Sequence, residues 1–138
     1  MRTGLLLLIL IITIRTGAQR ASNFIRKGNE QFREQKYDQA ELQYGNALKQ
    51  EPTNTTAKFN LANTLYRRGK YEEATKTYGD ITAVEKNATL NSKACYNQGV
   101  TLSSQHKLEE SIEAYKNALR QTPVILKPGK TCKRLFWN

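Results

Sequence analysis

Histidine is almost absent from this sequence, since His106 is the only one in 138 residues. Histidine is the side chain most often used for proton transfer near neutral pH, but His106 falls in an expected polar turn, where we predict a solvated side chain and no general base. The chain also lacks a Gly-x-Ser-x-Gly nucleophile elbow, a Gly-rich phosphate loop and a His-Glu-x-x-His zinc helix. We therefore predict that the protein is not an enzyme and uses no metal and no cofactor.

Cysteine is nearly as rare, with only Cys95 and Cys132. The two residues make no metal-binding spacing, and an exported protein could carry them free or paired, so the sequence gives no ground for predicting a disulfide. Cys95 falls on an apolar helical face, which favours a small packing residue over a nucleophile.

No apolar run is long enough to indicate a membrane span by itself. The longest, at residues 5–14, ends at Arg15, whereas a spanning helix needs roughly 20 apolar residues. A positively charged start, a short apolar core and the small residues at 16–18 are typical of a secretory signal peptide. We predict a signal peptide at residues 1–19 and an exported, periplasmic protein; an uncleaved membrane anchor is the alternative.

The charge distribution gives little reason to expect an anionic partner. The formal net charge is +10, which alone would suggest nucleic acid or a membrane surface. However, two arginines lie in the expected signal and four basic residues lie in the last twelve positions, while residues 20–123 carry 16 Lys and Arg against 12 Asp and Glu. The remaining +4 is ordinary for a soluble surface. We predict no nucleic-acid partner, and membrane contact only through a partner or an uncleaved signal.

What the sequence does contain is a repeated stretch. KYDQAELQYGNAL at residue 36, KYEEATKTYGDI at 70 and KLEESIEAYKNAL at 107 match one another, and KGNEQF at 27, LANTLY at 61 and QGVTLS at 98 match in the same register. The spacing is 34 residues between the first two copies and 37 between the last two, which is typical of a helical repeat. The three extra residues, in TAVEKNATLN, add a turn to one helix or lengthen a loop.

Each copy predicts two helices joined by a short polar turn. Apolar and small residues recur at helical spacing in both halves of each copy, and the turns fall at EQK, RGK and QHK. Gly28 and Gly99 are expected to oppose the small residues Ala40 and Ser111, while the tyrosines fill the space between copies. Neither helix can bury its apolar stripe alone, so we predict an all-α protein of stacked helix pairs.

On these residues the chain resembles the tetratricopeptide repeat (TPR) family. The family pattern of aromatic, Gly, aromatic, Ala, aromatic, Ala and Pro is met in the first copy by Phe24, Gly28, Phe32, Ala40, Tyr44, Ala47 and Pro52. It departs at Lys27, Ile81 and Lys86, where Leu, Ala and Pro are usual. The resemblance implies a right-handed α-solenoid in residues 20–123, built of three helix-turn-helix repeats at residues 21–54, 55–91 and 92–123.

A narrower resemblance concerns the end of the expected signal and the start of the first repeat. GAQ at residues 17–19 and RKGNEQF from Arg26 are similar to the small exported TPR proteins of the bacterial aerotolerance (Bat) cluster of Bacteroidetes. This resemblance implies partners among the membrane-bound, von Willebrand A-type proteins of the same cluster, in an envelope complex at the inner membrane.

The TPR resemblance also implies a concave groove lined by the first helix of each repeat. Aromatic rings mixed with amides and cations suit an extended peptide or a partner helix, because amides pair with main-chain groups while rings cover apolar side chains. The alternative for the aromatic residues is that they belong mainly to the core. The expected peptide-binding residues are Asn29, Phe32 and Arg33 in the first repeat, Phe59, Asn60, Asn63, Tyr66 and Arg67 in the second, and Lys93 and Tyr96 in the third.

Some TPR proteins hold the terminal carboxylate of a peptide with a clamp of Lys and Asn, then Asn, then Lys and Arg on successive repeats. Asn29, Asn60 and Lys93 match that pattern. Ile25 and Asn97 replace two of its three cations, so a carboxylate held mainly by charge would be bound weakly. The resemblance therefore favours a peptide groove without a strong carboxylate clamp.

The last residues, VILKPGKTCKRLFWN from Val124, do not continue the repeat. Pro128 and Gly129 stand where a further helix would begin, although a repeat array needs a polar cap over its last apolar face. Two interpretations of this irregular basic tail at residues 124–138 stay open: a tail of the native protein, or a frameshift product whose shifted frame encodes the capping helix DPETRKNLQKALLE. On both, the last face, with Ile112 and Leu119, is expected to be under-covered.

The function predicted from these features is non-catalytic. We expect an exported scaffold that binds a peptide segment or helix of a partner protein in the groove and assists the assembly of an envelope complex. The alternative is a self-assembling structural oligomer, formed through the under-capped last repeat.

Overall fold

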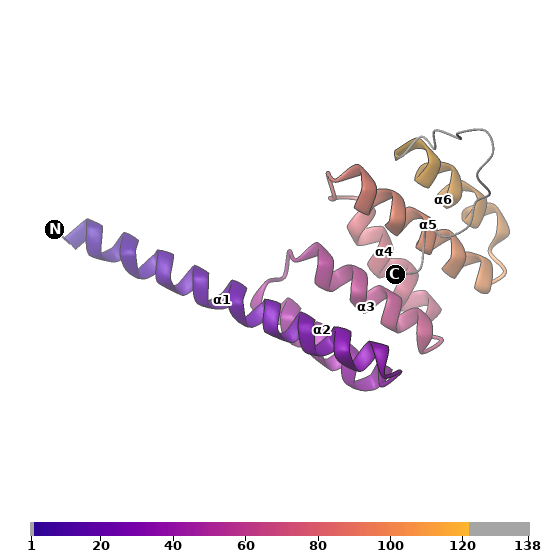
Figure 1. Ribbon diagram of the computed structural model, residues 1–138. Coiled ribbons are helices and arrows are strands. Elements are labelled where there is room, and N and C mark those ends of the chain that lie inside the picture. The colour runs from indigo at the N-terminus through magenta and orange to yellow at the C-terminus, as the bar shows by residue number, and fades with distance from the viewer. Residues whose placement is uncertain (1, 122–138) are drawn as a thin grey trace, which may run out of the picture. The chain divides into compact units, whose positions relative to one another are not determined.

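The computed structural model describes the backbone of residues 2–121 and the side chains of residues 18–121. These residues form six helices and no strand, so the all-α class expected from the sequence is confirmed (Figure 1). The chain divides into two compact bodies, Met1–Thr77 and Tyr78–Asn138, with the division inside the fourth helix. The helices are α1 (Arg2–Arg33), α2 (Tyr37–Gln50), α3 (Thr55–Arg67), α4 (Tyr71–Thr82), α5 (Ala88–Ser104) and α6 (Leu108–Gln121).

The same turn geometry follows α1, α3 and α5. Gln35, Gly69 and His106 have positive φ angles of 60°, 74° and 61°, and they occupy the polar turns expected between paired helices. In each turn the next N–H donates to the carbonyl five residues earlier, as from Lys36 to Gln31 at 2.9 Å. This arrangement pairs carbonyls that a helix end would otherwise leave unsatisfied. The backbone therefore repeats at the spacings seen in the sequence.

Helix α1 is longer than the repeat predicts. It begins at Arg2 and runs unbroken to Arg33; its second half lies against α2, and its first half extends past α2 (Figure 1). The expected signal at residues 1–19 and the first repeat helix share this one helix, and cleavage between them stays a prediction. Among residues 18–121, no helix is both long and apolar enough to cross a membrane. The tail at residues 124–138 lies outside the described residues.

The three extra residues of the last copy lengthen a helix. Helix α5 has 17 residues, whereas α3 has 13, and α5 begins about one turn earlier than the 37-residue spacing from α3 would give. The added helical turn, one of the two alternatives that the sequence left open, is therefore observed. Buried Asn91 holds the loop before α5, because its Nδ2 donates to the carbonyls of Thr82 and Glu85 at 3.1 and 2.9 Å.

Close packing in two helix pairs depends on a glycine that faces a tyrosine ring. A Cβ added at Gly28 on α1 would stand 2.6 Å from Cε1 of Tyr44 on α2, and one at Gly99 on α5 would stand 2.7 Å from the ring of Tyr115 on α6. Tyr44 is 1% exposed, and burial of such a side chain stabilises a fold by about 1.5–3 kcal/mol. The rings were expected to fill the space between copies; the structure adds that each lies against the glycine of its own helix pair.

An ionic cluster joins α2 to the turn after α3. The Arg68 guanidinium contacts Asp38 at 2.5 Å and also Glu41, and Lys70 Nζ lies 3.0 Å from Glu41 Oε1. Burial alone would raise the pKa of Glu41, but hydrogen bonds from Arg68 and Lys70 outweigh it, and the pKa lies below its ordinary value of 4.5. The folded protein therefore holds Glu41 ionised more strongly than the unfolded chain does.

Gly28→Ala is expected to lower the free energy of unfolding by about 1–3 kcal/mol, because the new methyl group must displace the buried ring of Tyr44. Gly45→Ala is the matched control, since no atom lies within 4 Å of a Cβ added there and alanine favours a helix over glycine by up to about 1 kcal/mol. Urea unfolding followed by circular dichroism measures both variants. Equal free energies of unfolding for the two variants would contradict the close contact between Gly28 and the ring of Tyr44.

Neutralising Glu41 is expected to weaken the acid sensitivity of the fold. A carboxylate whose pKa is lowered by folding contributes its full stabilisation above the unfolded pKa, and the contribution is lost as the pH falls through the folded pKa. Glu41→Gln should therefore lose less Tm than the wild type between about pH 5 and pH 3. Glu30→Gln, at an exposed ion pair with Arg26, is the control and should follow the wild type. If the Tm of Glu41→Gln and that of the wild type fell equally with pH, the ionic cluster would not contribute to the acid sensitivity of the fold.

Candidate functional site

The ten residues expected to bind a peptide lie on three helices. Helices α1 and α3 are in contact within the first body, whereas α5 belongs to the second. The structure therefore gives a mutual arrangement for the eight residues on α1 and α3. Helix α1 carries Asn29, Phe32 and Arg33, α3 carries Phe59, Asn60, Asn63, Tyr66 and Arg67, and α5 carries Lys93 and Tyr96.

Asn29 and Asn60 form an amide pair that connects α1 to α3. Asn60 Nδ2 donates to Asn29 Oδ1 at 3.0 Å, and the same oxygen accepts a hydrogen bond of 2.7 Å from the hydroxyl of Tyr44 on α2. Asn29 is exposed and Asn60 is half-buried, while Tyr44 is buried. Three helices thus meet at one amide oxygen, which lies between the core and the surface.

Tyr44 is a residue of the candidate site that sequence reasoning missed, because from the sequence it is expected in the core alone. Burial raises the pKa of Tyr44 to about 12, although the nearby charge of Arg33 acts in the opposite direction. Its hydroxyl therefore stays protonated at neutral pH and remains a hydrogen-bond donor. The sequence does contain an indication of this contact. Asn29 and Tyr44 are 15 residues apart, and Asn63 and Tyr78 repeat that spacing.

The face around the amide pair carries further amide and cationic side chains. Asn60, Asn63 and Arg67 follow one another at intervals of three and four residues and so share one face of α3. Asn63 is half-buried and Arg67 is exposed. On α1, exposed Arg33 lies one turn after Asn29. Amides flanked by guanidinium groups favour a ligand rich in hydrogen-bond acceptors and negative charge.

The aromatic residues of the expected site are half-buried. Phe32 packs edge-on against Tyr37 with ring centroids 5.3 Å apart, and Tyr66 packs against Tyr71 at 5.5 Å. Tyr96 makes a similar contact with a ring of α6. One side of each of these rings belongs to the packing, and the exposed remainder is available at the surface.

Of the three positions that match a carboxylate clamp, the structure gives a mutual arrangement for two. Asn29 and Asn60 are in direct contact. Lys93 is exposed on α5, in the second body. Half-buried Ile25 offers no charge where the clamp pattern has lysine. Within the first body, the arrangement is therefore that of an amide pair and not of a clamp with a lysine beside it.

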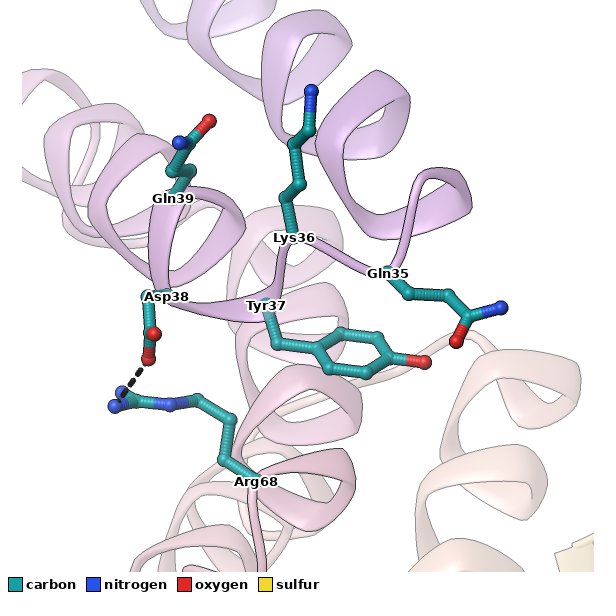
Figure 2. A pocket seen from close by; sticks show the side chains of 6 residues that line it. All are labelled: Gln35, Lys36, Tyr37, Asp38, Gln39 and Arg68. Atoms are coloured by element: carbon teal, nitrogen blue, oxygen red, sulfur yellow. Dashed lines mark ion pairs between the residues drawn. The ribbon is translucent and has the colours of Figure 1, made fainter.

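A separate cavity of about 370 Å³ opens at the turn between α1 and α2. Figure 2 shows Asp38 and Arg68 pointing toward one another at this cavity, and Arg68 also contacts Glu41. Because its arginine is already paired with two carboxylates, the cavity is a poor site for an anion. None of the expected site residues lines it; the lining residues are Gln35, Lys36, Tyr37, Asp38, Gln39 and Arg68.

The two side chains considered as nucleophile or base lie where packing and turn formation place them. Cys95 is buried and is a free thiol whose pKa is raised by burial, and its Sγ donates to Asn91 Oδ1 at 3.3 Å. A raised pKa makes a thiol less reactive, which agrees with a packing role. His106 is exposed in the turn after α5. Cys132 lies outside the described residues.

A known family model matches most of this chain. The family model described as the TT21 fifth ARM repeats domain matches residues 29–125, which include α2 to α6 and the end of α1. A search of curated proteins gives no match.

Solved structures similar to this chain include several TPR domains. The first TPR of Spaghetti (RPAP3) bound to the HSP90 peptide SRMEEVD is 27% identical, with a TM-score of 0.71 over 79% of this chain and 84% of that one. The first TPR domain of human RPAP3 is 26% identical, with a TM-score of 0.70 over the same shares. The N-terminal domain of stress-induced protein-1 (STI-1) from C. elegans is 19% identical, with a TM-score of 0.73 over 77% of this chain and 87% of that one, and shows a likeness of fold alone.

The fold shared with these structures is typically that of a non-catalytic scaffold for protein interactions. The repeated helix pairs, the recurring turn geometry and the family match over more than two thirds of the sequence agree with one another. The chain belongs to the family of the TT21 fifth ARM repeats domain and is a TPR- and ARM-like helical repeat protein.

Proposed function

We propose that this protein is a non-catalytic scaffold that binds a peptide segment of a partner protein on the face formed by α1 and α3. The observation that carries the proposal is the hydrogen bond between Asn29 and Asn60, which joins the two helices at an exposed amide. Asn63 and Arg67 continue this face along α3. Amides suit the main chain of an extended peptide, and half-buried rings beside them suit its apolar side chains.

A solved relative supports a peptide as the ligand. The first TPR of Spaghetti (RPAP3), which is 27% identical to this chain, holds the HSP90 peptide SRMEEVD. That peptide contains three carboxylate side chains, and acidic side chains would also suit Arg33 and Arg67 here. We therefore propose an extended segment with acidic residues as the ligand class.

The cellular setting is part of the proposal and rests on the sequence. The signal-like residues 1–19 favour export to the periplasm, and residues 20–123 are proposed to form three TPR repeats. The resemblance to the aerotolerance cluster favours von Willebrand A-type membrane proteins as partners. In that setting the scaffold would assist the assembly of an envelope complex.

Asn63→Ala and Arg67→Ala are each expected to weaken peptide binding about tenfold, because each removes a polar anchor from the face. The probes are linear peptides that the purified chain selects from a random display library, with affinity measured by fluorescence anisotropy. The matched controls are Asn46→Ala and Lys49→Ala, which make the same kinds of truncation on α2 and should leave the affinity unchanged. A library without binders, or equal affinities in all four variants, would refute the proposed function.

Self-assembly through α6 is a second candidate function, because a specific observation favours it. Leu108, Ile112 and Leu119 are 62%, 53% and 60% exposed and share one face of α6. Ile112 and Leu119, which the sequence analysis expected to be under-covered, are thus exposed within the described residues. A second copy that brought the same face of its own α6 would cover the stripe.

Under this second candidate, the purified chain is expected to form an oligomer that dissociates on dilution, as measured by light scattering. Ile112→Lys should abolish the oligomer without loss of helicity, because it places a charge in the apolar interface. Leu42→Lys is the control, since Leu42 is 59% exposed but lies on α2. A wild-type monomer at every concentration, or dissociation by both variants alike, would reject self-assembly through α6.

A further inference from the structure

Two segments of the chain match the acceptor motif for N-glycosylation, in which asparagine is followed by any residue but proline and then by serine or threonine. The motifs are NTT at Asn54 and NAT at Asn87. Such a motif is typical of a surface loop in a secreted protein, and each asparagine lies in a loop between successive helix pairs, at residues 51–54 and 83–87. The proposed peptide-binding function makes no use of either segment.

The amide nitrogen of Asn87 is available for modification in the folded protein. Asn87 is exposed and has an extended backbone, and its Oδ1 caps α5 by accepting a hydrogen bond of 3.0 Å from the N–H of Leu90. This cap uses only the amide oxygen. Within residues 18–121, Nδ2 of Asn87 has no hydrogen-bond partner. Thr89, which supplies the hydroxyl of the motif, is exposed as well.

Asn54 makes the same kind of cap, but its amide nitrogen is engaged. Its Oδ1 accepts a hydrogen bond of 2.9 Å from the N–H of Ala57, and its Nδ2 donates to Glu51 Oε2 at 2.7 Å. Asn54 is also half-buried. A hydrogen bond to a carboxylate is stronger than one between neutral groups, so modification of Asn54 must break a contact that Asn87 does not have. The two motifs are therefore unequal in the structure.

The residue two places before the asparagine differs between the motifs. It is Glu85 before Asn87 and Pro52 before Asn54. Glu85 Oε1 accepts a hydrogen bond of 2.8 Å from the N–H of Asn87, so this carboxylate lies beside the asparagine. A carboxylate offers a modifying enzyme a charge to bind, whereas proline offers none.

The loop that carries Asn87 is held from inside the second body. Asn91 is buried, and its Nδ2 donates to the carbonyls of Thr82 and Glu85 at 3.1 and 2.9 Å. These contacts fix the main chain on the inner side of the loop, while the side chain of Asn87 remains exposed. A bulky polar group attached to Asn87 is therefore compatible with the folded loop.

We propose that Asn87 is the N-glycosylation site of the exported chain, in preference to Asn54. The donor is an oligosaccharide linked to a lipid through pyrophosphate. The bond between C1 of its first sugar and the pyrophosphate oxygen breaks, and the lipid pyrophosphate leaves with the electron pair. Asn87 Nδ2 forms the new bond to C1 and loses one proton. The amide oxygen is unchanged, so the cap on the N–H of Leu90 is retained.

This inference requires export, which is part of the proposed setting, but it does not require peptide binding. The test uses the full chain, including residues 1–19, in a bacterial host that has an oligosaccharyltransferase and its lipid-linked donor. The host is one in which the residues EKNAT, appended after Asn138, become glycosylated, which shows that the chain is exported and meets the enzyme.

Mass spectrometry of the purified chain without the appended residues measures the fraction glycosylated at each asparagine. We expect a fraction about tenfold higher at Asn87 than at Asn54, because the hydrogen bond to Glu51 reduces the population of free Asn54 amide. Absence of a glycan at Asn87, or equal fractions at the two positions, would overturn the inference.

Thr89→Ala removes the hydroxyl of the motif and leaves the helix cap of Asn87 intact, so it should abolish the glycan at Asn87 without loss of helicity. Thr56→Ala makes the same change in the other motif and should keep the wild-type fraction at Asn87. Circular dichroism shows whether each purified variant is folded. A glycan that remains on Asn87 in Thr89→Ala, or that is lost from it in Thr56→Ala, would refute the assignment.

Glu85→Gln removes the charge but keeps an oxygen that can accept from the N–H of Asn87. We expect the glycosylated fraction at Asn87 to fall about tenfold, because the enzyme loses a charged group to bind. An unchanged fraction would refute the role of the carboxylate. If peptides bind but Asn87 carries no glycan, this inference fails and the proposed function stands; if Asn87 is glycosylated but no peptide binds, the reverse holds.

Discussion

The contact between the ring of Tyr44 and the bare backbone at Gly28 is the constraint on which both the packing and the candidate site depend. No side chain separates α1 from the ring, so the ring can be buried against the helix surface itself. Asn29 directly follows Gly28, and a ring seated on this glycine therefore brings its hydroxyl to the neighbouring amide, at 2.7 Å. Burial of the aromatic ring and orientation of the surface amide are thus consequences of one contact.

The α5–α6 pair shows which part of this arrangement the fold requires. Gly99 and Tyr115 make the same close approach, but Val100 stands where the first pair has Asn29. Packing is therefore repeated without the amide. The glycine and the tyrosine serve the packing of helices in both bodies, whereas the asparagine adds a polar group to the surface of the first. A repeat protein can vary recognition in this way without disturbing its core.

Much of the fold could be predicted because the repeat encodes it locally. Helical spacing and polar turns gave the paired helices, and Gly69 is the residue type that a left-handed turn favours. Gln35 and His106 adopt the same geometry with a side chain, and only their register in the repeat indicated it. The choice between an added turn and a longer loop could not be made from spacing, because both absorb three residues. In the structure the added turn brings Asn91 to the carbonyls of Thr82, at the end of α4, and Glu85, in the loop.

For the candidate site, the sequence predicted which residue types are present and which of them share a helix face, but not how their polar atoms are oriented. Spacing placed Asn60 and Arg67 on one side of α3, but an amide has a donor end and an acceptor end, and the end it presents depends on a buried hydroxyl from another helix. The contacts of the arginine side chains could not be predicted from the sequence either. Arg67 and Arg68 are adjacent and chemically equal, yet Arg68 is engaged by two carboxylates in the ionic cluster while Arg67 shares the face of Asn60. The polarity of the candidate site is therefore set by internal contacts, which composition and periodicity do not contain.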